Sequence, residues 1–437
     1  MINNESKELL SSLSFCVFDL ETTGGNQKSD KIIEIGMVNI DNLQIGEKVN
    51  FLVDPERKIP DFIQKLTSIK QADVEGCPRI EDLMDKILEI IGDRILVAHN
   101  ASFDVPFLNS VLERMGRPRV ENKSICTNLM TKYLIPTMMN SNLNYMSNIF
   151  NISHQKAHRA LDDADATAKL FLNYLKIFED KGVKKVNHLY YPKNRYELDL
   201  TNFKKESTTE EVLEKIKTID SPFLLSLKGH NGIILSAFPC SGNEEELDHI
   251  QGLIEETDWE TLTIKLVGPF TEVLIKFNHL FAKLNSEQKE SVISKLWEFH
   301  IPNGDRSELK KSAKERLSND FVIMNHLVPE QFTIYPMSAL GHRNELVFRY
   351  PGHKKKLIQY INSKSNKMMS GKMRKVSYSA PLKDFLDCYM CTMLDKNTEI
   401  LLFNKFSAKK DEEKLHTTIE KFLSKNPNTY NYPQKYI

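Results

Sequence analysis

The feature that most constrains this chain is a pair of acidic residues at the end of its first apolar run. Asp19 and Glu21 follow the strand-forming residues 15–18, and a second apolar run, residues 32–38, comes after a glycine-containing polar loop. This pattern predicts two paired strands. Side chains two positions apart on a strand leave the same face of the sheet, so the two carboxylates must lie close together. Either both acids face water, or a divalent cation such as Mg²⁺ or Mn²⁺ relieves their repulsion.

Length and composition narrow the remaining possibilities. With 437 residues, of which 41% are hydrophobic and 27% charged, the chain is expected to form two globular domains. Lys+Arg and Asp+Glu both total 59, so the net charge indicates neither nucleic acid nor a membrane as a partner. No apolar run is long enough to span a bilayer, and the polar residues 1–7 do not resemble a signal peptide. Six scattered cysteines favour reduced thiols, and we expect a cytoplasmic protein.

A second candidate segment places an acid after another buried strand. The apolar run 95–98 continues directly into His99 and Asn100, and a helix is expected to begin at Asp104. An aspartate at a helix start often serves only as an N-cap. The end of a buried strand also presents its groups to a crevice, so a functional role for Asp104 stays open.

A third candidate segment opens an alanine-rich helix that continues through residue 175. His158 precedes three acids in the first turns, Asp162, Asp163 and Asp165. These acids could serve only the helix dipole and its capping. The small alanine side chains allow this helix to pack closely on a sheet.

Taken together, the three segments resemble the motifs of the DEDDh 3′→5′ exonuclease superfamily. This superfamily includes the proofreading epsilon subunit of bacterial DNA polymerase III and ribonuclease T. The motifs are Phe-Asp-Leu-Glu-Thr-Thr-Gly, His-Asn-Ala-x-Phe-Asp-x-x-Phe-Leu and His-x-x-x-x-Asp, in the family's order over about residues 13–178. Ser68 departs from the pattern, because a glycine is usual at its position.

The resemblance implies an α/β fold class: a ribonuclease H-like mixed sheet flanked by helices, followed by a separate α+β module. We expect the exonuclease domain at residues 10–180, a linker at 181–205 and an accessory α+β module of unknown function at 206–437. Within the first domain, residues 47–53 predict a third strand, and residues 80–91 predict a helix with one apolar face.

The resemblance also implies the composition of an active site. The implied ligands of two Mg²⁺ or Mn²⁺ ions are Asp19, Glu21, Asp104 and Asp163. His158 would be the general base for the attacking water, and Asp163 stands at the family's spacing from it. Two ions can neutralise charge on the attacking and leaving oxygens of a phosphodiester, and imidazole can accept a proton near neutral pH. The residues expected to contact substrate are Leu20, Thr22, Thr23, His99, Asn100 and Phe103, although Phe103 could instead pack in the core.

These expectations define a metal-dependent 3′→5′ exonuclease that acts on single-stranded or frayed 3′ ends of DNA in replication proofreading or repair. Two alternatives stay open: an RNA-processing 3′→5′ exoribonuclease with the same site, and a non-catalytic replisome or scaffold subunit. The intact set of site residues argues against the non-catalytic alternative. Expected partners are DNA or RNA 3′ ends, and a DNA polymerase or sliding clamp; no membrane is expected.

Four patterns in the second module allow more than one interpretation. A hairpin at 223–236, with residues 271–274 later, faintly resembles the GIY-YIG nuclease module but lacks its tyrosines. Cys388 and Cys391 are half a zinc site or ordinary core residues. Residues 331–335, Gln-Phe-Thr-Ile-Tyr, resemble the peptide by which bacterial replication proteins bind the sliding clamp, or form a strand.

The fourth pattern is a basic segment from Arg343 to Lys375. It contains Lys354, Lys355 and Lys356, and aromatic residues are interleaved with its lysines. Basic and aromatic side chains together suit single-stranded nucleic acid, whereas a solvated surface would have the same composition.

Overall fold

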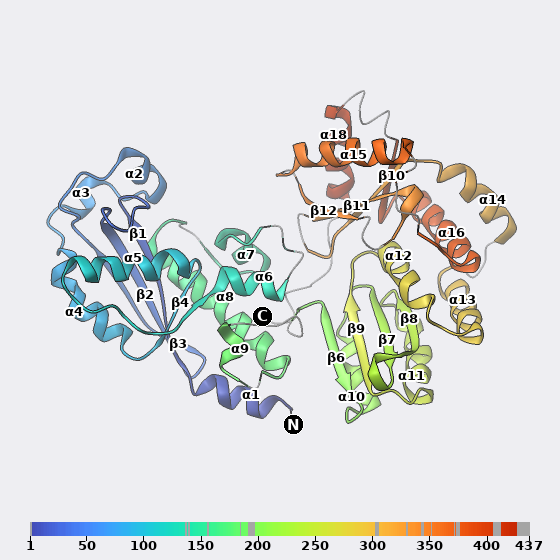
Figure 1. The fold of residues 1–437 in the computed structure, drawn as a ribbon, viewed down its shortest axis with the longest axis horizontal. Helices are drawn as coiled ribbons and strands as arrows, with labels where there is room; N and C mark the ends of the chain where they lie inside the picture. Colours follow the sequence, from blue (N-terminus) through green and yellow to red (C-terminus); the bar gives the residue numbers. More distant parts are fainter. Residues whose placement is uncertain are drawn as a thin grey trace. The chain divides into compact units, whose positions relative to one another are not determined.

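The computed structural model divides the chain into two units, residues 1–198 and a second unit that begins at Asp199 (Figure 1). It describes the whole chain except residues 1, 136–137, 139, 155–156, 184, 191–196, 302–305, 329–330, 342–344, 351, 371, 373–375, 405–411 and 426–437. None of the helices in the described part combines the length and the apolar character needed to cross a membrane.

Unit 1 is built on a five-stranded mixed sheet with the order β3-β2-β1-β4-β5. The strands are β1 (Ser14–Thr22), β2 (Ile32–Asp41), β3 (Gln44–Leu52), β4 (Ile95–Ala98) and β5 (Ser124–Cys126). The first three strands form an antiparallel meander, whereas β1 pairs in parallel with β4, and β4 with β5. The central position of β1 places its end in the middle of the sheet edge.

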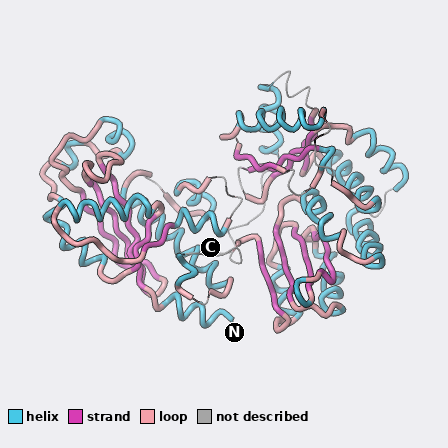
Figure 2. Tube along the Cα trace, in the orientation of Figure 1, coloured by secondary structure: helices cyan, strands magenta, loops and turns pink. Residues whose placement is uncertain are grey.

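Helices cover both faces of this sheet (Figures 1 and 2). They are α1 (Ile2–Ser11), α2 (Asp61–Thr67), α3 (Gln71–Val74), α4 (Ile80–Ile91), α5 (Ala101–Arg114), α6 (Thr127–Leu134), α7 (Leu143–Ile149), α8 (Ala160–Asp180) and α9 (Asn187–Tyr190). One core cluster joins alternate β1 residues, such as Cys16 and Phe18, to apolar side chains of α4 and α5. On the other face Phe15 packs edge-on against Phe171 of α8, with ring centroids 4.9 Å apart. A mixed sheet flanked by helices confirms the predicted fold class of the first domain.

Unit 2 contains two four-stranded antiparallel sheets, with the orders β6-β9-β7-β8 and β12-β11-β10-β13. Their strands are β6 (Leu200–Lys204), β7 (Phe223–Lys228), β8 (Ile234–Cys240), β9 (Thr261–Leu266), β10 (Phe321–Asn325), β11 (Gln331–Pro336), β12 (Leu346–Arg349) and β13 (Ile400–Phe403). The helices of eight or more residues are α10 (Thr209–Lys217), α11 (Leu247–Glu256), α12 (Phe270–Phe281), α13 (Ser286–His300), α14 (Arg306–Arg316), α15 (Lys354–Met369), α16 (Ala380–Lys396) and α18 (Glu412–Lys425).

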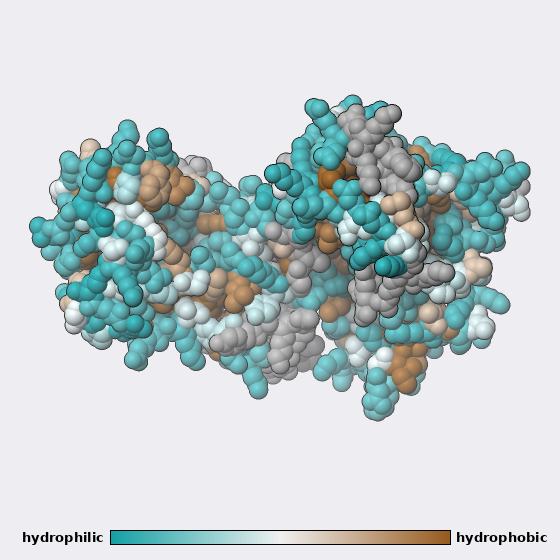
Figure 3. Space-filling model, turned by 45° about the horizontal axis from the view of Figure 1, so that its top comes forward, coloured by the Kyte–Doolittle hydropathy of each residue, from teal (hydrophilic) through white to brown (hydrophobic). Residues whose placement is uncertain are grey.

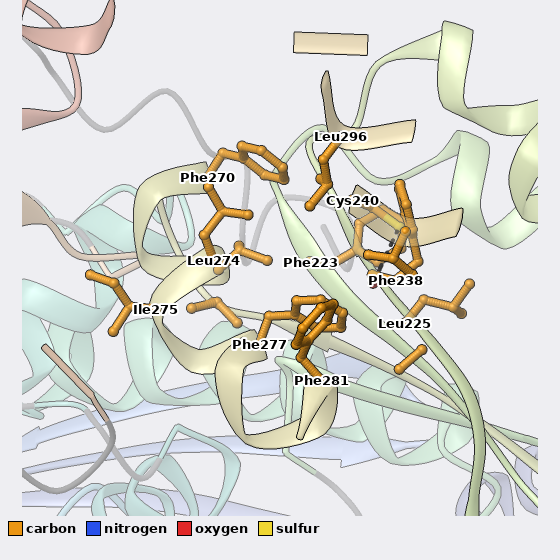
Figure 4. Close-up of a cluster of buried hydrophobic side chains, with 14 of the residues drawn as sticks. Phe223, Leu225, Phe238, Cys240, Phe270, Leu274, Ile275, Phe277, Phe281 and Leu296 are labelled. Atoms are coloured by element: carbon orange, nitrogen blue, oxygen red, sulfur yellow. Dashed lines mark hydrogen bonds between the residues drawn. The ribbon is translucent and has the colours of Figure 1, made fainter. Parts of the chain in front are cut away.

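The main core of unit 2 lies between α12 and the strands β7 and β8. Figure 4 shows Phe270, Leu274, Phe277 and Phe281 of α12 directed toward Phe223, Leu225 and Phe238 of the sheet. These side chains recur on one face of the helix at a spacing of three or four residues, as expected for an amphipathic helix packed on a sheet. The accessory module is therefore α+β, as predicted.

Two expectations for the region beyond residue 180 need correction. The predicted linker, residues 181–205, contains helix α9 and strand β6, which has mainly polar side chains and pairs antiparallel with β9. A short, polar edge strand has the composition of a linker, which explains the misassignment. Residues 271–274 lie in α12 and not in a strand, so the resemblance to a GIY-YIG module extends no further than the hairpin of β7 and β8.

The clamp-binding and zinc interpretations also fail. Residues 331–335 form β11, a strand between β10 and β12 in which every residue is buried, so these side chains are not exposed for a sliding clamp. Cys388 and Cys391 are buried free thiols on α16, and Cys388 packs in the main core of the unit. Both cysteines are therefore ordinary core residues.

The basic segment is partly a helix. Lys354 begins α15 and is 3.2 Å from the Glu420 carboxylate, whereas Lys355 and Lys356 in the same turn are exposed. The rings of Phe348 and Tyr350 are in a core cluster and are not available for stacking on bases. Arg343, Arg374 and Lys375 lie outside the described residues. A backbone contact by the exposed lysines stays a prediction.

The face of the molecule in Figure 3 is mainly hydrophilic, with small separate apolar areas. The large apolar side chains exposed among the described residues are Phe62, Leu66, Leu129, Ile233 and Met369. Isolated exposed apolar side chains are common on globular proteins.

Candidate active site

Strand β1 directs Asp19 and Glu21 toward helix α8. Successive side chains of a strand point to opposite faces. Leu20 is in the core cluster with α4 and α5, and Phe15 contacts α8 on the other face, so the odd-numbered acids share the face of Phe15. Glu21 is only 8% exposed. The expectation that the two acids simply face water is therefore wrong.

Asp104 joins this group from the first turn of α5. The helix begins at Ala101 after Asn100, three residues earlier than predicted, so Asp104 is not its N-cap. The carboxylate of Asp104 is 4% exposed and accepts a hydrogen bond from the backbone N–H of Leu20, the residue between the two acids of β1. This bond fixes Asp104 at the end of β1.

Asp163 and His158 reach the same place from the start of α8. The carboxylate of Asp163 is 2.5 Å from His154 Nε2 and accepts a 3.3 Å hydrogen bond from the backbone N–H of His158. His158 is exposed and adopts a left-handed backbone conformation, with φ of 63°. Glu21, His158 and Asp163 each offer a ligand atom within 4.8 Å of the others, which is a suitable arrangement for one metal ion.

A glycine in β2 permits this close approach of α8. Gly36 lies opposite Asp19 in the antiparallel pairing of β1 and β2. A Cβ atom at Gly36 would lie 2.3 Å from the carbonyl of Ala160, the first residue of α8. The absence of a side chain therefore lets the start of α8 lie on β2, from which Asp163 reaches the carboxylates of β1.

The four acids form an electrostatically strained group. Burial, followed by repulsion from neighbouring carboxylates, raises the pKa of Glu21 to about 8. Burial also raises the pKa of Asp104 to about 7, and that of Asp19 well above its ordinary value. At neutral pH these groups share protons unless a cation compensates their charge. A cluster of carboxylate oxygens is the donor set that Mg²⁺ or Mn²⁺ prefers, so the residues fit a divalent metal.

The residues expected to contact substrate have various local roles. The Thr22 hydroxyl donates to the Gly24 carbonyl at 2.7 Å, and the Thr23 hydroxyl accepts from the Lys31 N–H at 3.0 Å. These bonds order the loop after β1, and Leu20 is buried in the core. Asn100 is exposed beside the site. Contacts of Leu20, Thr22, Thr23 and Asn100 with substrate stay predictions.

His99 and Phe103 are also held by neighbouring groups. The ring nitrogens of His99 are each 2.9 Å from an oxygen, Thr127 Oγ1 and the Ser141 carbonyl. Burial lowers the pKa of His99 to about 4, so the ring is neutral at physiological pH. The Phe103 ring is half-buried and lies 5.6 Å from that of Phe107, as in the core-packing alternative. Substrate contacts of His99 and Phe103 also stay predictions.

The sequence interpretation missed two residues of this site, His154 and Gly36. Both leave a signal that could have been noticed. His154 lies four residues before His158, and Gly36 lies inside a predicted strand, which often marks a close backbone approach.

Comparisons with known proteins agree with this geometry. Residues 16–171 match the RNase_T exonuclease family. The DNA polymerase III PolC-type of Caldanaerobacter subterraneus subsp. tengcongensis is 37% identical over 189 residues, which are 43% of this chain and 13% of that protein. The corresponding protein of Clostridium perfringens is 40% identical over 176 residues, 40% of this chain and 12% of that protein. The chain thus spans only about an eighth of these relatives.

A longer match extends beyond the exonuclease region. The DNA polymerase III PolC-type of Halalkalibacterium halodurans is 29% identical over 311 residues, 66% of this chain and 21% of that protein. Among solved structures, Exonuclease X in complex with 5′ overhanging duplex DNA is 26% identical, with 40% of this chain and 97% of that chain covered and a TM-score of 0.33.

Proposed function

We propose, from the premise that residues 16–171 form a DEDDh 3′→5′ exonuclease domain, that this chain removes nucleotides from the 3′ ends of DNA. One observation carries the proposal. Acids from β1, α5 and α8 converge on one place, where burial raises the pKa values of Asp19, Glu21 and Asp104, and His158 lies beside them. A non-catalytic scaffold would have no need for such a strained group.

Asp19, Glu21, Asp104 and Asp163 would hold two Mg²⁺ or Mn²⁺ ions. When bound, the ions neutralise charge on the attacking and leaving oxygens of a phosphodiester. His158 accepts a proton from the attacking water as the new P–O bond forms and the P–O3′ bond breaks. The products are a nucleoside 5′-monophosphate and a strand shortened by one residue with a free 3′-hydroxyl.

The identity of the relatives supports DNA as the substrate. The curated relatives reported above are DNA polymerases III of PolC type, and the match includes the exonuclease region of this chain. We therefore place the activity in replication proofreading or repair in the cytoplasm, with a DNA polymerase as partner. The carboxylates and His158 act on the phosphate and its attacking water, and these groups are the same in DNA and RNA. Cleavage of RNA in place of DNA would therefore make the protein an exoribonuclease.

The test compares DNA and RNA of one sequence. Single strands labelled at the 5′ end are incubated with Mg²⁺, with Mn²⁺ or with EDTA, and products are resolved by length. We expect stepwise shortening of DNA from the 3′ end, loss of activity in EDTA and no cleavage by Asp19→Asn. The control Asp41→Asn changes an acid at the far end of β2 and should cleave normally. Absence of cleavage of both strands, or full activity of Asp19→Asn, would contradict the proposal.

A further inference from the structure

A buried carboxylate outside the metal group is hydrogen bonded to the segment that carries His158. Glu34 of β2 is fully buried. Its Oε2 accepts from Arg159 Nε and from the Ala160 N–H, each at 3.0 Å. Its Oε1 accepts from Arg159 Nη2 at 2.7 Å and from Asn50 Nδ2 at 2.9 Å. Four donors satisfy this carboxylate, and two of them form the planar, bidentate arrangement that arginine makes with carboxylates.

Through these bonds Glu34 holds the two residues that follow His158 in the chain. Arg159 and Ala160 are the next two residues of the chain, and Ala160 is the first residue of α8. His158 itself is exposed and has a left-handed backbone, a conformation that costs free energy for a residue with a side chain. An exposed residue in such a conformation needs its neighbours to hold it, and the Glu34 carboxylate holds both neighbours on the C-terminal side.

Glu34 also lies next to the metal group without belonging to it. It is the direct partner of Glu21 in the pairing of β1 and β2, and like charges directly opposite one another repel. Burial tends to raise the pKa of Glu34, yet the hydrogen bonds from Arg159, Asn50 and Ala160 lower it overall. Although Glu34 lies opposite Glu21, Arg159 holds the Glu34 carboxylate through both of its oxygens.

We infer that Glu34 and Arg159 are a pair of positioning residues, which hold the loop at His158 so that its imidazole faces the attacking water. This inference rests on the proposed function. The pair contacts neither metal nor substrate and would act through His158. A pair that only stabilises the fold would lower activity to the same extent whether or not His158 is present.

The experiment is a double-mutant cycle on the full chain. Arg159→Met should lower kcat about 10–100-fold, as for other partners that orient an active-site group, with KM for a single-stranded DNA near the wild-type value. Arg159→Lys, which keeps the charge but loses the bidentate bond, should recover part of the rate. In a His158→Ala background, Arg159→Met should cause no further loss. The matched control Asp41→Asn removes the ion pair between Asp41 and Arg94 at the other end of β2 and should leave kcat unchanged.

Two results would overturn the inference: wild-type kcat in Arg159→Met, or an equal loss in the presence and absence of His158. If Arg159→Met does not fold, as judged by circular dichroism, the same cycle is run with Arg159→Lys. Failure of the proposed function itself is distinguishable, because the wild type would then cleave nothing. In that case hydrogen exchange of the backbone amides at residues 158–160 decides: exchange should become faster in Arg159→Met, because the Glu34 carboxylate no longer holds this loop, and unchanged exchange overturns the inference.

Discussion

Gly36 and Asp19 are direct partners in the antiparallel pairing of the two central strands of unit 1. Asp19 supplies a carboxylate. Gly36 has no side chain, so the start of α8 can lie against β2 and Asp163 can approach Asp19. The arrangement explains how a site can draw on residues more than one hundred positions apart and still be compact.

Gly36→Ala should impair both stability and activity. The new methyl group would meet the Ala160 carbonyl at 2.3 Å, so α8 must move away from β2 and take Asp163 with it. Overpacking of this kind costs about 1–3 kcal/mol of unfolding free energy. Thermal unfolding and nuclease rate would be measured beside Gly46→Ala, a glycine of β3 whose Cβ would meet its nearest neighbour at 3.6 Å. Equal rates for the two variants would show that α8 does not depend on Gly36.

Metal binding should reverse the pH dependence of stability. The folded pKa values of Glu21 and Asp104, about 8 and about 7, lie above the values of about 4 for unfolded chains. The folded state therefore binds more protons in this range, and its stability falls as pH rises from about 4 to about 8. Thermal unfolding in EDTA should show this fall, and Glu21→Gln should reduce it. Excess Mn²⁺ should restore stability at the high-pH end; a wild type and Glu21→Gln with identical pH profiles would contradict the assignment.

His158→Ala should lose on the order of 10²–10⁴-fold in rate, the usual contribution of a general base. Rates are measured at saturating metal beside the control Asp41→Asn, and a His158→Ala variant that keeps the wild-type rate would assign the base elsewhere.

His154→Ala should weaken metal binding through Asp163. The His154 ring is 2.5 Å from the Asp163 carboxylate and is almost fully buried, so its loss frees Asp163 to rotate. We expect about a 10-fold higher Mn²⁺ concentration for half-maximal activity, and partial recovery in His154→Gln, whose amide can donate the same bond. His230→Ala, an exposed histidine of unit 2, is the control. A metal requirement equal to that of wild type would mean that Asp163 is held by its helix alone.

The local sequence pattern was sufficient to predict many of the helices and strands. The predicted strand at residues 95–98 and the predicted helix at residues 80–91 coincide with β4 and α4, because a buried run and an amphipathic period are visible within a few residues. The amphipathic pattern of the 12-residue helix α12 appears only over a window longer than the four residues 271–274 that were compared with the GIY-YIG module. The polar strand β6 depends on pairing with β9, which no local pattern reveals.

For the candidate site, too, some features could be predicted from the sequence and others depend on tertiary packing. Resemblance to the DEDDh motifs was sufficient to single out Asp19, Glu21, Asp104, His158 and Asp163, which the structure brings to one end of the sheet. Their environment was not predictable, because the bonds of Glu34 with Arg159 and of His154 with Asp163 join side chains whose proximity arises only when α8 lies on β2. Likewise, the buried position of β11 follows from its neighbours in the sheet and not from its own six residues.

The place of α8 in the chain has a consequence for protein synthesis. Helix α8 supplies Asp163, yet it is the last long helix of unit 1 to leave the ribosome, whereas β1 is made near the beginning. At ordinary rates of translation the interval is on the order of ten seconds. During that time a nascent chain has the two acids of β1 but lacks His158 and Asp163. The activity proposed above therefore cannot begin before α8 has been made.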